Sequence, residues 1–214
     1  MKLCLIYNYA QHYRTSIFKL IDQNFDCDFV FGDSMEDVKK MDYSQLNGKV
    51  TEVHNKRFRG VYFQNGVTEF LRQDYDRYIM LGETRCISTW LFLILSKFYR
   101  KKKVYLWSHG WYGKESRIER IIKKMLFKMA DGTFLYGNYA RELMIKEGFN
   151  KDKLFVIHNS LAYDEQLATR DKLKKEDVYT VHFGNNNKNL VFVGRLTEVK
   201  KLDMILHAME KCQK

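Results

Sequence analysis

A phosphate-binding pattern lies near the carboxyl end of the sequence, in "LVFVGRLTEVKKLDMILHAMEK" (190–211). Gly194 and Arg195 follow a short apolar run, and Lys200 sits at the expected start of an amphipathic helix. A helix N-terminus has free N–H groups and the positive end of the helix dipole, so cations there cost stability unless an anion binds. We expect Gly194, Arg195 and Lys200 to hold a phosphate or diphosphate. The open alternative is a solvated surface helix in a lysine-rich chain.

Four earlier residues with useful chemistry follow strand-like runs. His109 comes directly after an apolar run at 103–108, and Glu83 and Arg85 follow another that begins at residue 77. Arg14 lies in the loop after the first strand-like run. Ligands of open parallel sheets bind beyond the carboxyl ends of the strands, so these side chains are candidates for one crevice. His109 could instead cap its loop, and Glu83 and Arg85 could contact only each other and solvent.

The stretch "FVGRLTEVKKLD" resembles the start of the second domain in family 4 glycosyltransferases of the GT-B fold. The family pattern is a strand, then G-R-L, a Lys five residues after the Arg, and an acidic residue three further on. These positions are Gly194, Arg195, Lys200 and Asp203 here. The sequence departs from the pattern at Lys201, where the family usually has glycine.

The resemblance implies a retaining enzyme that transfers a hexose from a nucleotide-diphosphate sugar to a glycan or lipid-linked acceptor. Arg195 and Lys200 would hold the donor diphosphate, and His109 would lie near the transferred sugar. The acceptor-side candidates are Arg14, Glu83 and Arg85. The donor substrate is the only small molecule implied, and no metal or other cofactor is expected. The implied setting is the synthesis of a bacterial surface polysaccharide, such as lipopolysaccharide or capsule.

The pattern of apolar runs predicts an α/β fold, a Rossmann-like parallel sheet flanked by helices. Strands are expected at 3–7, 26–32, 49–55, 77–83, 103–110, 132–137 and 153–159. Helices are expected after the first strand, at 86–99 as a buried helix, at 117–130 as an amphipathic helix and at 138–147, with 61–71 helical or mixed. Strands that alternate with helices at this spacing are typical of a parallel sheet with right-handed crossovers.

Three regions follow from this pattern. Residues 1–160 form the predicted N-terminal, acceptor-side domain, and residues 161–189 the interdomain connection, with a short helix near 177–182. Residues 190–214 are expected to supply only the first strand, at 190–193, and the first helix of a second Rossmann-like domain. Because twenty-five residues cannot build a core of their own, we expect a fragment of a longer enzyme that is inactive alone.

Composition favours anionic partners. The chain has 214 residues and a formal net charge of +11, much of it in two basic stretches at 99–105 and 119–129. We expect these stretches to meet an anionic membrane surface, although a solvated helix face would explain them too. The most apolar stretch, 90–99, is too short to span a bilayer, and no signal peptide is recognisable. The expected location is cytoplasmic, peripheral on the inner face of the plasma membrane.

Other classes of protein fit less well. The four cysteines are scattered without metal-ligand spacing. A nucleotide-binding oxidoreductase should show G-x-G-x-x-G after its first strand, and "IYNYAQHY" does not. A non-enzymatic module that binds anions or nucleic acid remains the alternative, suggested by charge alone. We expect no nucleic-acid partner, because no nucleic-acid-binding motif accompanies that charge.

Overall fold

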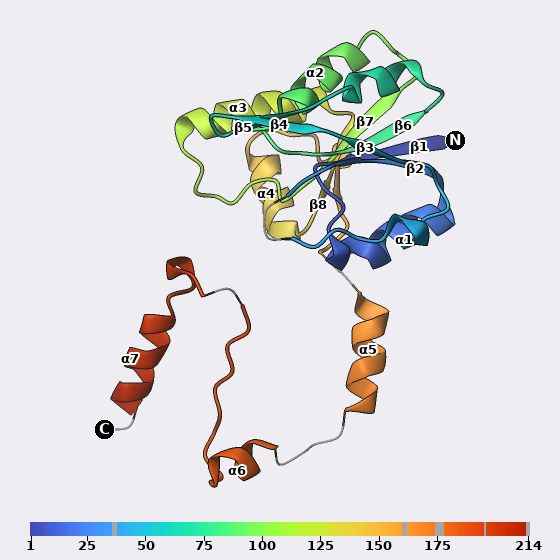
Figure 1. Ribbon diagram of the computed structural model, residues 1–214. Coiled ribbons are helices and arrows are strands. Elements are labelled where there is room, and N and C mark those ends of the chain that lie inside the picture. Colours follow the sequence, from blue (N-terminus) through green and yellow to red (C-terminus); the bar gives the residue numbers. More distant parts are fainter. Residues whose placement is uncertain (36–37, 160–161, 174–177, 195, 213–214) are drawn as a thin grey trace. The chain divides into compact units, whose positions relative to one another are not determined.

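The structure is a computed structural model that describes residues 1–35, 38–159, 162–173, 178–194 and 196–212. The chain divides into two compact units, Met1–Ala168 and Thr169–Lys214. The first contains the sheet and the helices α1 to α4 that pack on it (Figure 1).

A seven-stranded parallel sheet forms the centre of the first unit. Its strands are β1 (Lys2–Tyr7), β2 (Asp26–Gly32), β3 (Val50–Val53), β6 (Arg77–Leu81), β7 (Lys103–Ser108), β8 (Gly132–Leu135) and β9 (Leu154–Val156). They lie in the order β3-β2-β1-β6-β7-β8-β9. The order reverses between β1 and β6, which is the topological switch point where sheets of this class bind ligands. The predicted fold class is confirmed.

Alternation along the strands separates two cores. In β1, Leu5 joins a cluster with Phe18 of α1 (Thr15–Asn24), while Ile6 on the opposite face joins Phe92 of α2 (Ile87–Ser96). The second core also takes in α3 (Arg117–Met129) and α4 (Asn138–Lys146). Helix α1 therefore covers one face of the sheet and the other three helices cover the other (Figure 1).

A hairpin interrupts the strand–helix alternation after β3. Its strands are β4 (Asn55–Phe58) and β5 (Val61–Gln64), and a 3-10 helix, Val67–Arg72, follows. The single strand expected at 49–55 therefore ends early, at Val53, while the mixed structure expected at 61–71 is confirmed. Arg59 and Gly60 both have positive φ, 45° and 83°, as a two-residue type I′ hairpin turn requires.

The helices on the second face expose more apolar surface than the sequence predicts. The expectation of a buried helix at 86–99 is only partly right, since Phe92 is fully buried but Ile94 is 50% exposed. In α3, Leu126 is buried, whereas Ile118 is 70% and Met125 59% exposed. The apolar stripe of each helix is wider than the contact it makes with the sheet.

The second unit differs from the prediction at its start. It contains α6 (Val178–Phe183) and α7 (Leu202–Cys212), while α5 (Tyr163–Lys172) spans the boundary between the units. The short helix expected near 177–182 corresponds to α6, although residue 177 is outside the described residues. The strand expected at 190–193 is wrong: these residues pair with no strand in the described part of the chain, and Val193 is 91% exposed. A strand cannot form without a neighbour to receive its hydrogen bonds.

The helix of the phosphate-binding pattern begins later than expected. Glu198–Lys200 is a 3-10 turn, and Thr197 makes no side-chain cap. Lys201 has a φ of 50°, a left-handed conformation that separates the turn from α7. Lys200 and Lys201 therefore precede the helix and do not occupy its first turn.

Candidate functional site

Two adjacent pockets lie at the carboxyl ends of the strands. The His109 pocket, of about 300 Å³, lies between the ends of β1, β6, β7 and β8 and α3, and its lining includes Arg14, Glu83, His109, Lys123 and Tyr136. The hairpin pocket, of about 470 Å³, lies between the ends of β1, β2, β3 and β6 and the β4–β5 hairpin. Glu83 lines both pockets, so they meet at this residue. The structure thus brings Arg14, Glu83 and His109 together, and Arg85 lines the hairpin pocket.

Arg14 is a buried cation enclosed by aromatic rings. Only 8% of the residue is exposed, and its guanidinium carbon lies 5.4 Å from the centres of both the Tyr7 and Trp107 rings. Its Nη2 donates to the Tyr136 hydroxyl at 2.8 Å, whereas its Nε has no hydrogen-bond acceptor. Among the described residues, no carboxylate pairs with Arg14. Aromatic faces offset part of the several kcal/mol that burying a lone charge costs, and an anion in the pocket would offset more.

His109 lies at the mouth of the same pocket. Its ring is solvent-exposed but packs edge-on against Tyr136, with 4.4 Å between the ring centres. Partial burial, followed by the positive charges of Arg14 and Lys123, lowers the pKa of His109 below its usual value. The imidazole is therefore neutral at pH 7 and can accept a hydrogen bond from a substrate hydroxyl.

The loop that carries His109 is held by a partly buried ion pair. The Glu115 carboxylate accepts the backbone N–H groups of Tyr112 and Gly113 at 2.7 and 3.0 Å, and it accepts Lys123 Nζ at 2.8 Å. Burial by itself raises the pKa of Glu115, but Lys123 and the backbone donors outweigh it and hold the pKa at about 2. Lys123 is thus neutralised by Glu115, which leaves Arg14 as the uncompensated cation in the described lining of this pocket.

Gly110 and Gly82 allow the strand ends to approach closely. Gly110 has a φ of 69°, and a Cβ there would lie 2.7 Å from Leu135 Cδ2. A Cβ on Gly82 would lie 2.9 Å from Ser108 Cβ. The Ser108 hydroxyl donates to Gly82 O at 2.9 Å and accepts from Gly110 N at 3.1 Å. Gly110 is therefore required by packing against Leu135 as well as by its left-handed conformation.

Glu83 and Arg85 do not pair with each other in the structure. Glu83 Oε2 accepts the Tyr62 hydroxyl at 2.8 Å, and the Arg85 carbonyl accepts Tyr62 N at 3.0 Å. The Arg85 side chain is exposed. The two residues hold the hairpin through Tyr62, a role that the sequence pattern did not predict.

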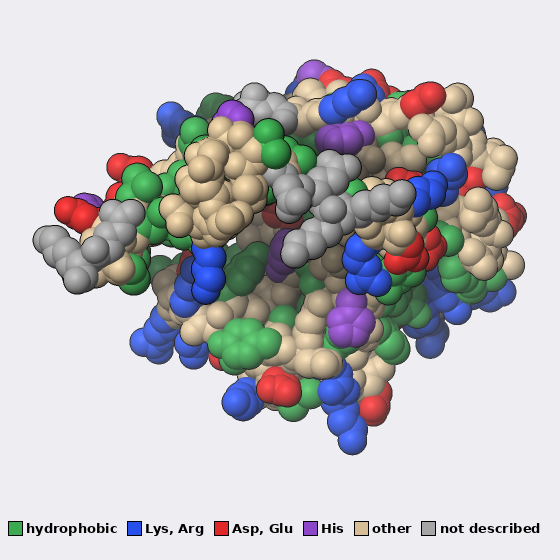
Figure 2. All heavy atoms as spheres, turned by 90° about the horizontal axis from the view of Figure 1, so that it is seen from below, with side chains coloured by type: hydrophobic (Ala, Val, Ile, Leu, Met, Phe, Trp, Pro, Cys, Tyr) green, Lys and Arg blue, Asp and Glu red, His purple; other side chains and the backbone are tan. Residues whose placement is uncertain are grey.

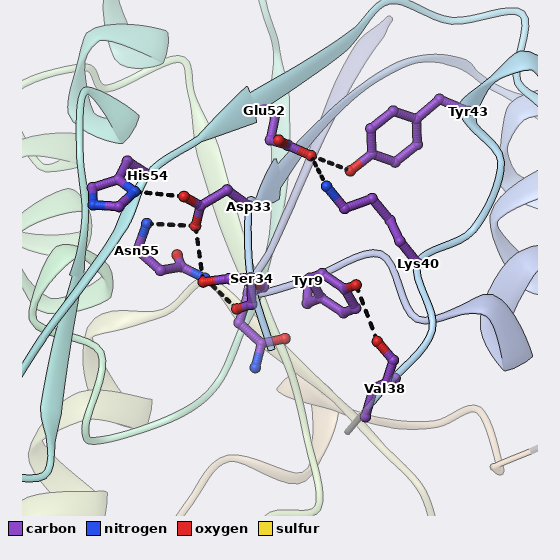
Figure 3. Close-up of polar contacts among 10 residues, drawn as sticks. Tyr9, Asp33, Ser34, Val38, Lys40, Tyr43, Glu52, His54 and Asn55 are labelled. Atoms are coloured by element: carbon purple, nitrogen blue, oxygen red, sulfur yellow. Dashed lines mark hydrogen bonds and ion pairs between the residues drawn. The ribbon is translucent and has the colours of Figure 1, made fainter. Parts of the chain in front are cut away.

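A polar network at the ends of β2 and β3 was missed by the sequence analysis (Figure 3). Asp33 Oδ2 lies 2.5 Å from His54 Nδ1, and Asp33 Oδ1 accepts Asn55 N at 3.0 Å. Burial alone would raise the pKa of Asp33, but the donors Asn55 and His54 hold it at about 2. Asn55 Nδ2 also donates to Asn8 O at 2.8 Å. The rule that selected His109, a polar residue directly after a strand, also selects Asp33, whereas His54 lies inside the strand that the sequence predicted at 49–55.

The residues predicted to bind the donor diphosphate belong to the second unit. Gly194 and Lys200 are both exposed there. Arg195 lies outside the described residues. The helix-start geometry on which the prediction rested is absent around Lys200, because α7 begins two residues later.

Metal-binding groups and membrane-spanning helices are two features that the described residues lack. Within the ranges that the structure describes, no group of three or more His, Cys, Asp or Glu side chains could hold a metal ion. In the same ranges, no helix combines the length and apolarity needed to cross a bilayer. Figure 2 shows that Lys and Arg side chains and hydrophobic side chains are both exposed on the face that it draws.

Comparison with solved structures identifies the fold. The chain resembles UDP-N-acetylglucosamine 2-epimerase from Rickettsia bellii, with a TM-score of 0.53 at 15% identity, covering 87% of this chain and 52% of that one. UDP-GlcNAc 2-epimerase from Methanocaldococcus jannaschii has a TM-score of 0.51 at 15% identity, and the match covers 86% of this chain and 52% of that one. HepE from Anabaena in complex with UDP has a TM-score of 0.51 at 13% identity, and the match covers 75% of this chain and 44% of that one.

These neighbours have GT-B-type Rossmann-like folds, in agreement with the parallel sheet described above. The chain spans about half the length of each of them. Comparisons with protein-family models and with curated protein sequences find no match to this chain.

Proposed function

We propose that this chain is the acceptor-side domain of a glycosyltransferase that resembles family 4 and uses a nucleotide-diphosphate sugar. The enzyme would transfer a hexose to the hydroxyl of a glycan or lipid-linked acceptor in the synthesis of a bacterial surface polysaccharide, with retention at the anomeric carbon. The bond from the anomeric carbon to the diphosphate breaks, and the acceptor oxygen bonds to that carbon. The proton of the acceptor hydroxyl leaves with the diphosphate.

The observation that carries the proposal is the buried, uncompensated guanidinium of Arg14 beside the neutral imidazole of His109. Charge on the diphosphate grows as its bond to the sugar breaks, and a fixed cation in a site of low dielectric stabilises that charge. His109 would accept a hydrogen bond from a sugar or acceptor hydroxyl. Gly194, Arg195 and Lys200 remain the proposed ligands of the diphosphate on the donor side.

Titration of the chain with UDP tests the placement of the donor. UDP is the probe because HepE, a structural neighbour, was solved with it. We expect the backbone amide signals of His109 and Gly110 to shift in heteronuclear NMR spectra, with smaller shifts in the hairpin. Shifts that avoid the His109 pocket, or none at millimolar UDP, would contradict the proposal.

The proposed peripheral contact with an anionic membrane is supported by the apolar face of α3. Ile121 and Met125 are 53% and 59% exposed on a helix that also carries cations. Part of the positive charge is neutralised, since Arg120 and Lys124 both lie near Glu147, at 3.4 and 3.8 Å. Apolar insertion, at about 25 cal/mol per Å² buried, would therefore contribute more than charge.

Liposome sedimentation distinguishes the two contributions. Ile121→Ser should lower binding to anionic vesicles by a factor of a few, because it removes apolar surface from the inserted face. Leu20→Ser on α1 is a matched control, since Leu20 is 50% exposed and α1 covers the opposite face of the sheet. Equal binding of both variants and the parent chain would exclude α3 as the contact.

A further inference from the structure

The hairpin pocket has a cationic rim that the proposed transfer chemistry does not use. Arg57, Arg59 and Arg85 line it, and Glu83 is the one carboxylate among the described lining residues. Glu83 is already an acceptor for the Tyr62 hydroxyl. Among the described lining residues, Arg59 and Arg85 alone thus set two positive charges against the single carboxylate of Glu83, facing a volume of about 470 Å³.

The hairpin that carries two of these arginines is fixed to the domain. Tyr62 binds the β6–α2 loop through its backbone and its hydroxyl, as described above. Gln64 Nε2 donates to Tyr7 O at 3.1 Å, and Gln64 N donates to Ser88 Oγ at 2.7 Å. Both Gln64 and Ser88 are buried. The hairpin wall of the pocket is thus held in place before a ligand binds, which lowers the cost of ordering it.

Arg59 occupies a turn position that suits other residues better. Its φ is 45°, in a left-handed region where Asn and Gly are common and long side chains are rare. Neither Arg59 nor Arg85 forms an ion pair with any described residue. A cation at a left-handed turn, with the Phe58 ring beside it but no ion-pair partner among the described residues, is suited to a ligand.

We propose that the hairpin pocket binds a phosphate or diphosphate group of the acceptor, an inference that rests on the proposed function. Planar guanidinium groups match pairs of phosphoryl oxygens, and Arg59 and Arg85 offer two such groups that form no ion pair with a described residue. The pocket meets the His109 pocket at Glu83. An acceptor held by its phosphoryl group in the hairpin pocket can therefore place a hydroxyl beside His109.

The test is an NMR titration of the chain with inorganic pyrophosphate, read at the amides of Gly60 and Arg85. Arg59→Asn and Arg85→Gln should each weaken binding roughly 10- to 100-fold, because each removes a charge-assisted hydrogen bond. Asn also suits the turn, so Arg59→Asn should keep the hairpin folded. Lys56→Gln is the matched control: it removes a cation from the same hairpin that does not line the pocket. Equal affinity in all three variants would overturn the proposal.

Further ligands identify the source of the phosphoryl group. Tighter binding of geranyl diphosphate than of glucose 1-phosphate would indicate a lipid-linked acceptor, and the reverse order would indicate a soluble sugar phosphate. Both outcomes support the proposal if they depend on Arg59 and Arg85. Glucuronate that binds as tightly as the phosphorylated ligands would overturn the phosphoryl assignment.

Titration with UDP separates this inference from the function on which it rests. Binding of UDP at the His109 pocket, together with pyrophosphate binding that ignores Arg59 and Arg85, would refute the hairpin pocket alone. Pyrophosphate binding that needs Arg59 and Arg85, without any UDP binding, would refute the placement of the donor alone. UDP that shifts only the Gly60 and Arg85 signals would make the hairpin pocket a donor site and overturn both.

Discussion

The two pockets present positive charge in different ways. In the His109 pocket, Arg14 is buried among aromatic rings and Lys123 is neutralised by Glu115. In the hairpin pocket, Arg59 and Arg85 are exposed to solvent. Salt screens a buried charge poorly, whereas interactions between exposed charges are largely screened beyond about 8 Å at physiological salt. The first arrangement suits charge that develops during a reaction, and the second suits capture of a charged group.

The largest expected effect is a loss of stability that differs between a glycine of the His109 pocket and a glycine of the hairpin pocket. Gly110→Ala should destabilise the chain by about 3 kcal/mol, because it adds backbone strain and a clash with the fully buried Leu135. Gly60→Ala should cost only about 1 kcal/mol, since nothing lies within 4 Å of the added Cβ and strain alone remains. Urea unfolding of both variants measures the difference. Equal losses would show that the end of β7 is not tightly packed.

Breaking the ion pair of the His109 loop should have the next largest effect. Glu115→Gln should cost about 2 kcal/mol at pH 7, because a charge-assisted hydrogen bond is lost and Lys123 is left unpaired. The pKa of Glu115, about 2, lies below the ordinary carboxyl value, so its stabilisation is present above pH 4–5. It is lost as the pH falls towards 2.

Unfolding at pH 7 and pH 3 measures this dependence, with Glu69→Gln as a control at an exposed carboxylate. The gap between Glu115→Gln and the parent chain should shrink at the lower pH. A gap of the same size at both values would mean that the carboxylate charge of Glu115 does not stabilise the loop.

The smallest effect concerns the protonation of His109. Its pKa is lowered by partial burial and by Arg14 and Lys123, so an unfolded chain takes up this proton first as the pH falls. The histidine therefore removes a little stability below about pH 6.5. Saturation with UDP should raise the pKa, because a bound diphosphate compensates Arg14. A midpoint in the free chain above the ordinary imidazole value, measured by NMR, would contradict this description of the pocket.

Much of the sheet was predictable, because buried parallel strands such as 3–7 and 103–108 give continuous apolar runs whatever their neighbours are. The hairpin was not, since its strands are short and Asn55, Arg57 and Arg59 resemble an ordinary polar loop. The run at 190–193 has the same apolar pattern as a buried strand, but no described strand pairs with it. Periodicity reports the tendency of a segment, and only tertiary partners decide whether that tendency is realised.

The candidate site, like the fold, could be predicted from the sequence only in part. Arg14 and His109 could be placed in one crevice because both follow parallel strands, but the aromatic enclosure of Arg14 depends on Trp107 and Tyr136, which lie far away in sequence. Helix α3 gave a clear amphipathic pattern, yet much of its apolar stripe is exposed. The pattern cannot tell which part of an apolar face the sheet will cover.

The most direct test of the account is the substitution Arg14→Met, with stability and UDP affinity measured on the same sample. Replacing a buried, uncompensated cation by an apolar side chain of similar length should leave stability unchanged or raise it by about 1 kcal/mol or more. The same change should weaken UDP binding, followed by tryptophan fluorescence from Trp107, by roughly 10- to 100-fold. A stability gain with a binding loss is the predicted result. Unchanged UDP affinity would contradict the account.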